Sequence, residues 1–300
     1  MSGNSVSGII DAHTHIWQRA SGDYGWITPD LVTLDHDFGL DDLTAERAAL
    51  GVDHIVLVQA ADTAGDTDRM LAEAAAHPEV AGVVAWLPLA GPGLDEALTD
   101  RLATGKVVGV RALIHDMADT RWVLRDDVAA GLDRLAAAGL AFDVVTSGPD
   151  GLALVPLLAA RHPSLRIVID HLGKPPIGAD AAALADWRSL LREAAASPNV
   201  AAKLSGLASA AGAPDSWTVA DLRPVVAEAV AAFGPERLMY GGDWPVCLLA
   251  GGYTRTFEGL HAALDVSAAE LEQIHRRSAI AWYRLEIEGL GGARQEMTQA

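Results

Sequence analysis

Two histidines one residue apart, His13 and His15, end a short apolar run near the N-terminus. Side chains of a β-strand alternate between its two faces, so both imidazole rings point to one side if this run is a strand. An imidazole in such a water-poor place usually serves as a metal ligand, a base or a hydrogen-bond partner. A His-x-His sequence alone is as often packing or surface as it is functional, so the rest of the chain decides its meaning.

Further polar side chains fall at the ends of later apolar runs. In chain order they are Gln59, Trp86, Arg111, His171, Lys203, Ser205 and Asp243. Together with the first pair, this set offers three imidazoles and one carboxylate. Such donors can hold one divalent ion with zinc-like preferences, or act without metal as a hydrogen-bonded acid/base group. The candidate metal ligands are therefore His13, His15, His171 and Asp243.

The positions of the apolar runs predict how these residues are brought together. Runs rich in Val and Ile start near residues 9, 54, 80, 107, 140, 166, 200 and 238, and helical patterns separate them. Strands that are apolar on both faces and alternate with helices indicate a parallel sheet covered by helices. We predict an α/β fold, a (β/α)8 TIM barrel in a single domain over residues 1–300, with the candidate residues at the C-terminal ends of its strands. An open doubly wound sheet is the alternative, but no Gly-rich phosphate turn follows the first run.

Composition excludes several classes of partner. The chain has 50% hydrophobic residues and a formal net charge of -18, which disfavours binding to nucleic acid or to acidic membrane surfaces. No apolar run approaches the roughly 20 residues that cross a bilayer. The single cysteine, Cys247, cannot form an internal disulfide, and the first residues lack the features of a signal peptide. We therefore expect a cytoplasmic protein that acts on a small molecule, with a homo-oligomer left open.

Four segments resemble the signatures of the amidohydrolase-2 group of the amidohydrolase superfamily. They are Ile10-Asp11-Ala12-His13-Thr14-His15, Asp170-His171-Leu172-Gly173-Lys174-Pro175, Lys203-Leu204-Ser205-Gly206 and Tyr240-Gly241-Gly242-Asp243-Trp244-Pro245-Val246. Within that group the chain is similar to the sugar-lactonase branch, which opens L-fucono-, L-rhamnono- and pyrone-dicarboxylate lactones. The resemblance covers nearly the whole chain, including the Tyr24-Gly25-Trp26 segment.

The resemblance implies a barrel that opens lactone rings with water. It makes Asp243 the base toward water and then the acid toward the leaving oxygen, as one of three catalytic residues with His171 and Arg111. The histidines polarise the carbonyl or hold one metal ion. Arg111 lies where this branch binds the carbonyl or a carboxylate of the substrate. Residues expected to contact the substrate are Gln59, Trp86, His115, Lys174 and Trp244.

The chain also departs from the superfamily pattern. Two-metal members use a carbamylated lysine on the fourth strand and a histidine on the fifth, whereas this chain has Arg111 there, and then Val145 and Thr146. Arginine stays charged and cannot be carbamylated in the same way, so a two-metal site is not expected. One metal or none remains open. Gly242 stands where the branch usually has a serine beside the catalytic carboxylate.

Some of these residues can instead have a purely structural role. Asp243 can be a helix N-cap, and Arg111 can be an ion pair at the barrel mouth. Six other histidines fall at loops or helix ends and are expected at the surface: His36, His54, His77, His162, His261 and His275. The long segment of residues 18–38 has no clear period, and long ordered loops are often functional.

Three functions compete at this point. Hydrolysis of a sugar-acid lactone is the main hypothesis. A zinc-dependent non-oxidative decarboxylase of an aromatic acid is the second, but those enzymes usually have a histidine on the fifth strand. A non-catalytic barrel that binds a sugar acid is the third. A substitution of Asp243 separates the third from the first two, because only a catalyst loses rate with its proton carrier.

Overall fold

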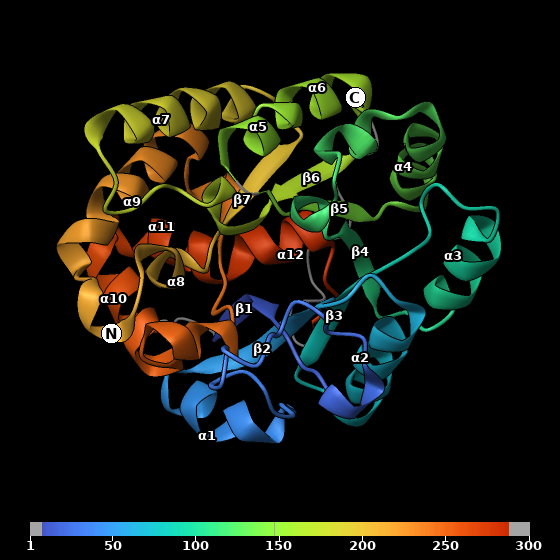
Figure 1. Ribbon diagram of the computed structural model, residues 1–300, viewed down its shortest axis with the longest axis horizontal. Helices are drawn as coiled ribbons and strands as arrows, with labels where there is room; N and C mark the ends of the chain where they lie inside the picture. The colour runs from blue at the N-terminus through green and yellow to red at the C-terminus, as the bar shows by residue number, and fades with distance from the viewer. Residues whose placement is uncertain (1–7, 147, 288–300) are drawn as a thin grey trace, which may run out of the picture.

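A computed structural model describes residues 8–146 and 148–287 and contains the predicted barrel (Figure 1). One eight-stranded sheet runs in the order β1 to β8, and each successive pair of strands is parallel. The strands are β1 (Ile9–Thr14), β2 (Val52–Val58), β3 (Val80–Ala85), β4 (Val107–Ala112), β5 (Ala141–Val144), β6 (Arg166–Ile169), β7 (Val200–Leu204) and β8 (Leu238–Tyr240). The expected absence of a signal peptide and the ends of the predicted 1–300 domain fall outside the described residues.

Helices surround the sheet and cover its outer face (Figure 1). They are α1 (Asp41–Ala49), α2 (Ala64–Ala76), α3 (Leu94–Leu102), α4 (Asp126–Ala138), α5 (Gly148–Leu152), α6 (Leu154–Arg161), α7 (Ala181–Ala195), α8 (Leu207–Ala211), α9 (Val219–Phe233), α10 (Tyr253–Ala263), α11 (Ala268–Glu272) and α12 (Ser278–Tyr283). Short 3-10 turns are η1 (Arg19–Ser21), η2 (Ile114–Asp116), η3 (Thr120–Leu124), η4 (Asp170–Gly173), η5 (Pro214–Ser216), η6 (Pro235–Arg237) and η7 (Val246–Ala250), and η8 (Gln273–Arg277) is a π-helical segment. Within the described residues, no helix has both the length and the apolar character that a membrane span requires.

The core has two parts, as a barrel requires. Leucine, valine and alanine side chains fill the layer between the strands and the helices. A second cluster joins side chains of β1 to β8, such as Ile10, Val84 and Met239, to Tyr283 of α12. Burial of apolar surface on both faces of every strand explains why the runs read as continuously apolar in the sequence.

Several strands end earlier than the apolar runs suggest. β5 stops at Val144, β6 at Ile169 and β8 at Tyr240, although apolar or motif residues continue beyond each. The chain leaves the sheet there because the following residues turn inward. His171 and Asp243 have φ angles of 54° and 55°, in the left-handed region that a strand cannot contain.

The seam between β8 and β1 is closed in an unusual way. In the described part of the chain, an isolated bridge between Thr14 and Trp244 takes the place of a strand ladder. The Asp243 amide donates to the His13 carbonyl at 2.8 Å, and the His15 amide donates to the Trp244 carbonyl at 2.7 Å. The loop after β8, and not the strand itself, therefore closes the barrel beside the histidine pair.

Two of the six histidines expected at the surface are buried. His162 and His275 are 3% and 4% exposed. His162 lies at the end of α6 and contacts Asp133 of α4 at 2.7 Å, and His275 lies in η8 against Phe257 and Tyr240. Helix ends in this barrel pack against neighbouring elements, so a position at a helix end did not mean exposure.

Candidate active site

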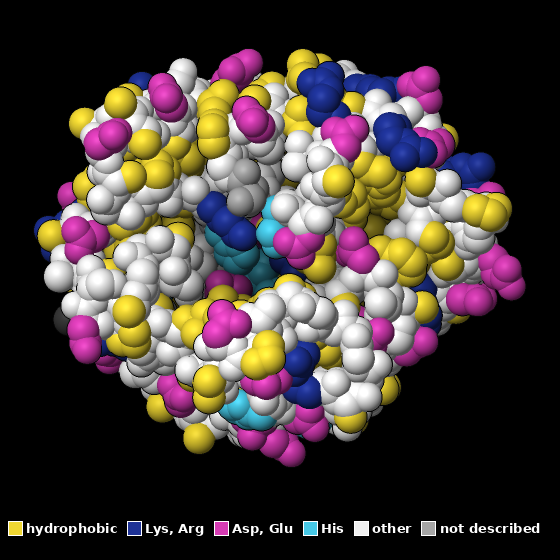
Figure 2. Space-filling model, in the orientation of Figure 1, with side chains coloured by type: hydrophobic (Ala, Val, Ile, Leu, Met, Phe, Trp, Pro, Cys, Tyr) yellow, Lys and Arg dark blue, Asp and Glu magenta, His cyan; other side chains and the backbone are white. Residues whose placement is uncertain are grey.

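A cavity of about 420 Å³ opens at the C-terminal ends of the strands. Figure 2 shows this face, where cationic and histidine side chains surround a hollow near its centre. Six of the residues expected at the site line the cavity: His15, Arg111, His115, His171, Lys174 and Asp243. Residues from the first, fourth, sixth and eighth βα units therefore meet at one place, as the barrel rule predicts.

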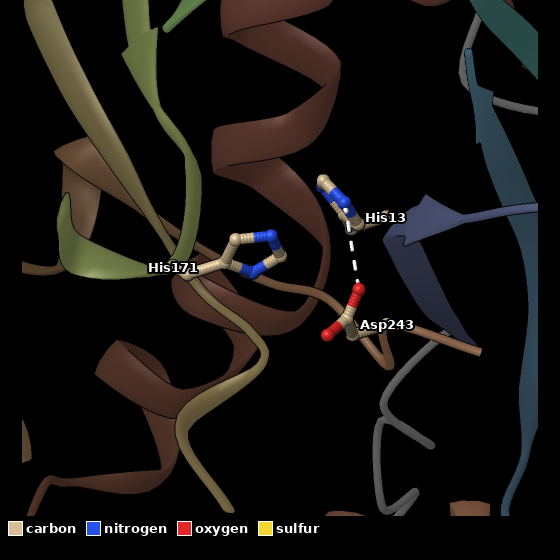
Figure 3. Close-up of side chains that lie close together, drawn as sticks. All are labelled: His13, His171 and Asp243. Carbon is tan, nitrogen blue, oxygen red and sulfur yellow. Dashed lines mark ion pairs between the residues drawn. The ribbon is translucent and has the colours of Figure 1, made fainter. Parts of the chain in front are cut away.

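Three side chains form a group that can hold a metal ion (Figure 3). His13, His171 and Asp243 each offer one ligand atom, and these atoms lie within 4.8 Å of one another. His15 lies beside them: its Nε2 is 3.1 Å from the His13 Nε2 and 3.6 Å from the Asp243 Oδ1. Imidazole nitrogens with one carboxylate oxygen are the donor set that zinc and similar ions prefer. The residues present therefore fit a single divalent metal.

The backbone of the turn after β6 directs two side chains into the cavity. His171, Leu172, Gly173 and Lys174 have φ angles of 54°, 53°, 72° and 55°, so four consecutive residues are left-handed. A left-handed conformation costs non-glycine residues roughly 1–2 kcal/mol each, and such strain clusters at functional sites. The Trp187 indole holds this turn by donating to the Leu172 carbonyl at 2.9 Å.

A buried string of charges lies beneath the metal group. The Lys203 ammonium is 2.6 Å from Asp143 Oδ2 and 3.0 Å from Asp170 Oδ1, and all three side chains are fully buried. Arg111 donates to Asp170 Oδ2 at 2.9 Å. Burial would raise the pKa of Asp170, but Lys203, His13 and Arg111 hold it well below its ordinary value. Burial raises the pKa of Asp143 to about 6 despite Lys203.

Sequence reasoning missed both of these carboxylates. Asp143 falls inside an apolar run, and Asp170 was noted only as part of a motif. The available signal was a carboxylate within, or directly after, a strand that is buried on both faces, because such a charge requires a partner. The expected ion pair of Arg111 at the barrel mouth exists, and the same side chain also lines the cavity.

The hydrogen bonds of His15 and His171 fix how their rings are presented. His15 Nδ1 lies 2.7 Å from the Val58 carbonyl, which can only accept, so Nδ1 donates and Nε2 is the nitrogen that faces His13 and Asp243. His171 Nδ1 lies 2.9 Å from the Ser205 hydroxyl. Burial lowers the pKa of His171 although Asp243 opposes the shift, so this ring is neutral at pH 7.

His13 has two competing partners at its inner nitrogen. Its Nδ1 is 3.0 Å from the Lys203 ammonium and 3.3 Å from Asp170 Oδ1. An ammonium only donates, so contact with Lys203 places the ring hydrogen on Nε2. Donation from Nδ1 to Asp170 instead leaves Nε2 free, which is the arrangement that a metal ligand needs. Burial and then Lys203 lower the pKa of His13 well below its ordinary value, so the ring is neutral in both cases.

Asp243 is ionised although it is buried. Desolvation would raise its pKa, but the electrostatic interactions with His171, His15 and Arg111 outweigh this effect and lower it. Its Oδ1 is 3.7 Å from the His13 Nε2, the contact drawn in Figure 3. An ionised carboxylate at the cavity wall is suited to accept a proton from water.

Three residues expected to contact substrate are not among those that line this cavity. Gln59 is fully buried. Its side-chain amide donates to the Arg111 backbone carbonyl at 3.2 Å, and the Gln59 backbone carbonyl accepts from the Arg111 guanidinium. Trp86 follows β3, where its amide donates to the Thr67 hydroxyl at 3.0 Å. Trp244 is 2% exposed and packs edge-on against Phe38. Gln59 and Trp244 thus support the cavity from within the core, and none of the three residues lines it.

Other cavity residues were not predicted as contacts. Trp26, Asp116 and Ser209 line the cavity. Trp26 belongs to the long segment of residues 18–38, and its indole donates to the Ala60 carbonyl at 2.8 Å. The hydroxyl of Ser209 is buried without a hydrogen-bond partner among the described residues. A long ordered loop was the available signal for Trp26, whereas nothing in the sequence pointed to Ser209.

Two basic groups at the cavity are perturbed by burial. Burial lowers the pKa of His115 to about 3, helped by the charges of Lys174 and Arg111. Burial also lowers the pKa of Lys174, which Asp243 and Asp116 oppose. His115 is therefore neutral at pH 7, and Lys174 brings its ammonium toward the same space as the Asp243 carboxylate.

The fold and the site define a (β/α)8 barrel with a metal-binding group at the C-terminal ends of its strands, an arrangement typical of metal-assisted hydrolases. The family model described as amidohydrolase matches residues 10–285, and the chain belongs to that family.

Relatives with assigned activities are similar over most of the chain. It is 38% identical to an L-fucono-1,5-lactonase of Burkholderia ambifaria over 81% of this chain and 82% of the relative. It is 36% identical to an L-fucono-1,5-lactonase of Burkholderia multivorans over 92% of this chain and 96% of the relative. A crystal structure of a Burkholderia multivorans amidohydrolase with bound zinc is 35% identical, with a TM-score of 0.84 and coverage of 93% and 99% of the two chains.

Proposed function

We propose that this protein hydrolyses the ring ester of a small sugar-acid lactone, with L-fucono-1,5-lactone as the first substrate to test. The observation that carries the proposal is the ionised Asp243 carboxylate. It lies within 3.7 Å of His13 and His15 and lines a cavity together with His171 and Arg111. The two L-fucono-1,5-lactonases at 36–38% identity support the choice of substrate.

The residues of the site supply what ester hydrolysis requires. Asp243 accepts a proton from the attacking water and returns it to the ring oxygen as the C–O bond breaks. Arg111 offers a positive charge to the carbonyl oxygen as negative charge develops on it. Lys174 and His115 donate to hydroxyl groups of the sugar. The metal, for which we propose zinc held by His13, His171 and Asp243 with His15 beside them, would polarise the carbonyl and lower the pKa of the water.

The other hypotheses have less support. A histidine on the fifth strand, typical of the decarboxylases, is replaced here by Val145, which lines the cavity. A non-catalytic barrel gives no reason for a buried, ionised carboxylate beside neutral imidazoles. The location of the protein in the cytoplasm stays a prediction, and so does the formation of a homo-oligomer.

The test is to offer L-fucono-, L-rhamnono- and L-galactono-lactones and to measure hydrolysis through the acid that is released. We expect Asp243→Asn to lower kcat by roughly 10²–10⁴-fold because the proton carrier is lost. Asp116→Asn is the matched control, since it removes a second carboxylate of the cavity that lies outside the metal group. A wild-type protein inactive on all three lactones, or an Asp243→Asn protein as active as the wild type, would refute the proposal.

A further inference from the structure

Asp11 is a buried carboxylate that the proposed chemistry does not use. It lies in β1 two residues before His13, and none of its surface is exposed. Its Oδ1 accepts from the His13 amide at 2.9 Å and from the Gly242 amide at 2.8 Å. Its Oδ2 accepts from the Tyr253 hydroxyl of α10 at 2.8 Å. One side chain therefore connects β1, the loop after β8 and the first turn of α10.

These bonds cross the seam where the described strands form no ladder. Gly242 immediately precedes Asp243, and the His13 amide belongs to a residue of the metal group. The Asp11 carboxylate thus connects the backbones that carry both partners of the 3.7 Å contact between His13 Nε2 and Asp243 Oδ1. A change in this connection moves one partner relative to the other.

The packing around Gly242 leaves no room for a side chain. A Cβ at this position would lie 2.2 Å from Tyr253 Cε2 and 2.5 Å from Asp11 Oδ2. The φ angle of Gly242 is outside the left-handed region, so the requirement is for space and not for glycine's conformational freedom. The absence of a Cβ lets the chain approach the Asp11 carboxylate, and the Tyr253 ring occupies the remaining space.

We propose that Asp11, held by Tyr253 and accommodated by Gly242, is a positioning residue that sets the distance between His13 and Asp243. The kinetic part of this inference rests on the proposed lactone hydrolysis, whereas its metal-binding part does not. Because the carboxylate is too far inside the seam to line the cavity, it acts through the backbone of its neighbours. Its loss should therefore reduce kcat and metal affinity and leave KM nearly unchanged.

Two substitutions of Asp11 form the first test. Asp11→Ala removes all three accepted hydrogen bonds. We expect kcat to fall about 100-fold, because misplacing a reacting group by about 1 Å costs roughly this factor in rate. We also expect KM to change less than threefold and the zinc dissociation constant to rise at least tenfold. Asp11→Asn keeps an oxygen for both amides and offers its NH2 to the Tyr253 oxygen, which can accept. We expect Asp11→Asn to retain at least a third of the wild-type kcat. Wild-type kcat and zinc affinity in Asp11→Ala, with only a lower Tm, would overturn the proposal.

A double-mutant cycle on Gly242 and Tyr253 tests the connection without removing Asp11. We expect Gly242→Ala to lower kcat at least 30-fold, and to have a smaller effect when Tyr253 is already alanine, because the colliding ring is gone and only the close approach to Asp11 Oδ2 remains. Equal effects of Gly242→Ala in both backgrounds would refute the steric part of the proposal.

Tyr253→Phe keeps the test decisive if Asp11→Ala does not fold. It removes one hydrogen bond, and we expect a five- to tenfold loss of kcat. Tyr24→Phe is the matched control, because its hydroxyl donates to another buried carboxylate, Asp66, at 2.7 Å. We expect Tyr24→Phe to lower Tm with kcat within twofold of the wild type, and equal kcat in both variants would contradict the proposal.

The outcomes also separate this inference from the proposed function. A wild-type protein that opens no lactone refutes the function, and the zinc affinities of the same variants still decide the role of Asp11. A wild-type protein that opens lactones while Asp11→Ala keeps its kcat and its zinc affinity refutes the inference alone.

Discussion

Lys203 is the residue on which the buried charges depend. Its ammonium lies between Asp143 and Asp170, and no side chain of the three reaches solvent. Removing one partner of a buried ionic group leaves an uncompensated charge, which costs far more than the intact group contributes. The residue therefore has a structural role in addition to its contact with His13.

We expect Lys203→Met to lower the free energy of unfolding by about 3–5 kcal/mol, because the buried Asp143 loses the cation that pairs with it and Asp170 keeps Arg111 but loses its second cation. Urea unfolding at pH 7 measures the loss. Lys106→Met is the matched control: this half-buried lysine donates to the Val80 carbonyl at 2.8 Å, and we expect a change below about 1 kcal/mol. Similar losses in both variants would contradict the role assigned to the charge string.

At the residue scale, the sequence predicted the residues that carry the chemistry better than the buried residues that hold them in place. His13, His171 and Asp243 could be predicted because reactive residue types stand at the ends of apolar runs. Asp11 and Asp170 could not be assigned, because their roles depend on neighbours more than 50 residues away, as in the bond from Arg111 to Asp170. Only the closed sheet brings such pairs together.

Among the elements, α4 approaches the chain after β3 unusually closely. A Cβ at Gly131 of α4 would lie 2.4 Å from the Leu89 carbonyl oxygen and 3.1 Å from its carbon. Both are backbone atoms, so no side chain can rotate away. The glycine permits the helix to pack against the barrel at this distance.

We expect Gly131→Ala to lower the free energy of unfolding by about 1–3 kcal/mol, despite the better helix propensity of alanine, because the helix must shift outward. Gly93→Ala is the control, since a Cβ there meets nothing within 4 Å. Denaturant midpoints of the two variants give the comparison. A stabilised Gly131→Ala protein would show that α4 is free to move.

The π-helical segment η8 contains the buried His275. Burial lowers the pKa of this imidazole to about 4, helped by the neighbouring His261. The unfolded chain, with a pKa near 6.5, binds the proton more readily than the folded protein does. The free energy of unfolding therefore falls as the pH drops from about 6.5 to about 4.

We expect His275 to contribute up to about 3 kcal/mol to this loss, since each pKa unit of difference corresponds to about 1.4 kcal/mol. Urea unfolding of the wild type and of His275→Gln at pH 7 and pH 4.5 tests this. The decrease between the two pH values should be smaller in the variant. An equal decrease would assign the acid sensitivity to other groups.

At the element scale, hydrophobic periodicity predicted which segments are strands and helices, and the structure confirms their order. The ends of the strands were less predictable. Leaving the sheet at Ile169 or Tyr240 depends on left-handed residues at His171 and Asp243, and few non-glycine residues take this conformation, although His and Asp do so more often than most.

For the whole molecule, metal binding and folding should be linked. The metal group combines residues of β1, η4 and the loop after β8, so an unfolded chain cannot assemble it. A ligand present at 100 times its dissociation constant stabilises the folded state by about 2.7 kcal/mol.

We therefore expect chelation to lower Tm by several degrees and added zinc to restore it. His171→Ala should abolish the response to both, because it removes one ligand. Scanning calorimetry measures the shifts, and magnesium serves as a control ion that prefers oxygen ligands. A Tm unaffected by chelator in protein shown to contain zinc would contradict the linkage.

The barrel as a whole could be predicted because eight evenly spaced runs leave few other ways to bury them. The closure of the β8–β1 seam could not, because Thr14 and Trp244 meet outside regular strand pairing. Backbone hydrogen bonds from the loop after β8, and not a regular strand ladder, complete this part of the ring.

That seam has a consequence for synthesis of the protein on the ribosome. The first βα unit emerges early, but its histidines remain without the Asp243 carboxylate until the eighth unit has been translated and has closed against it. A nascent or prematurely terminated chain thus carries half of a reaction centre and no chemistry, so activity reports that translation reached at least the loop beyond the last strand.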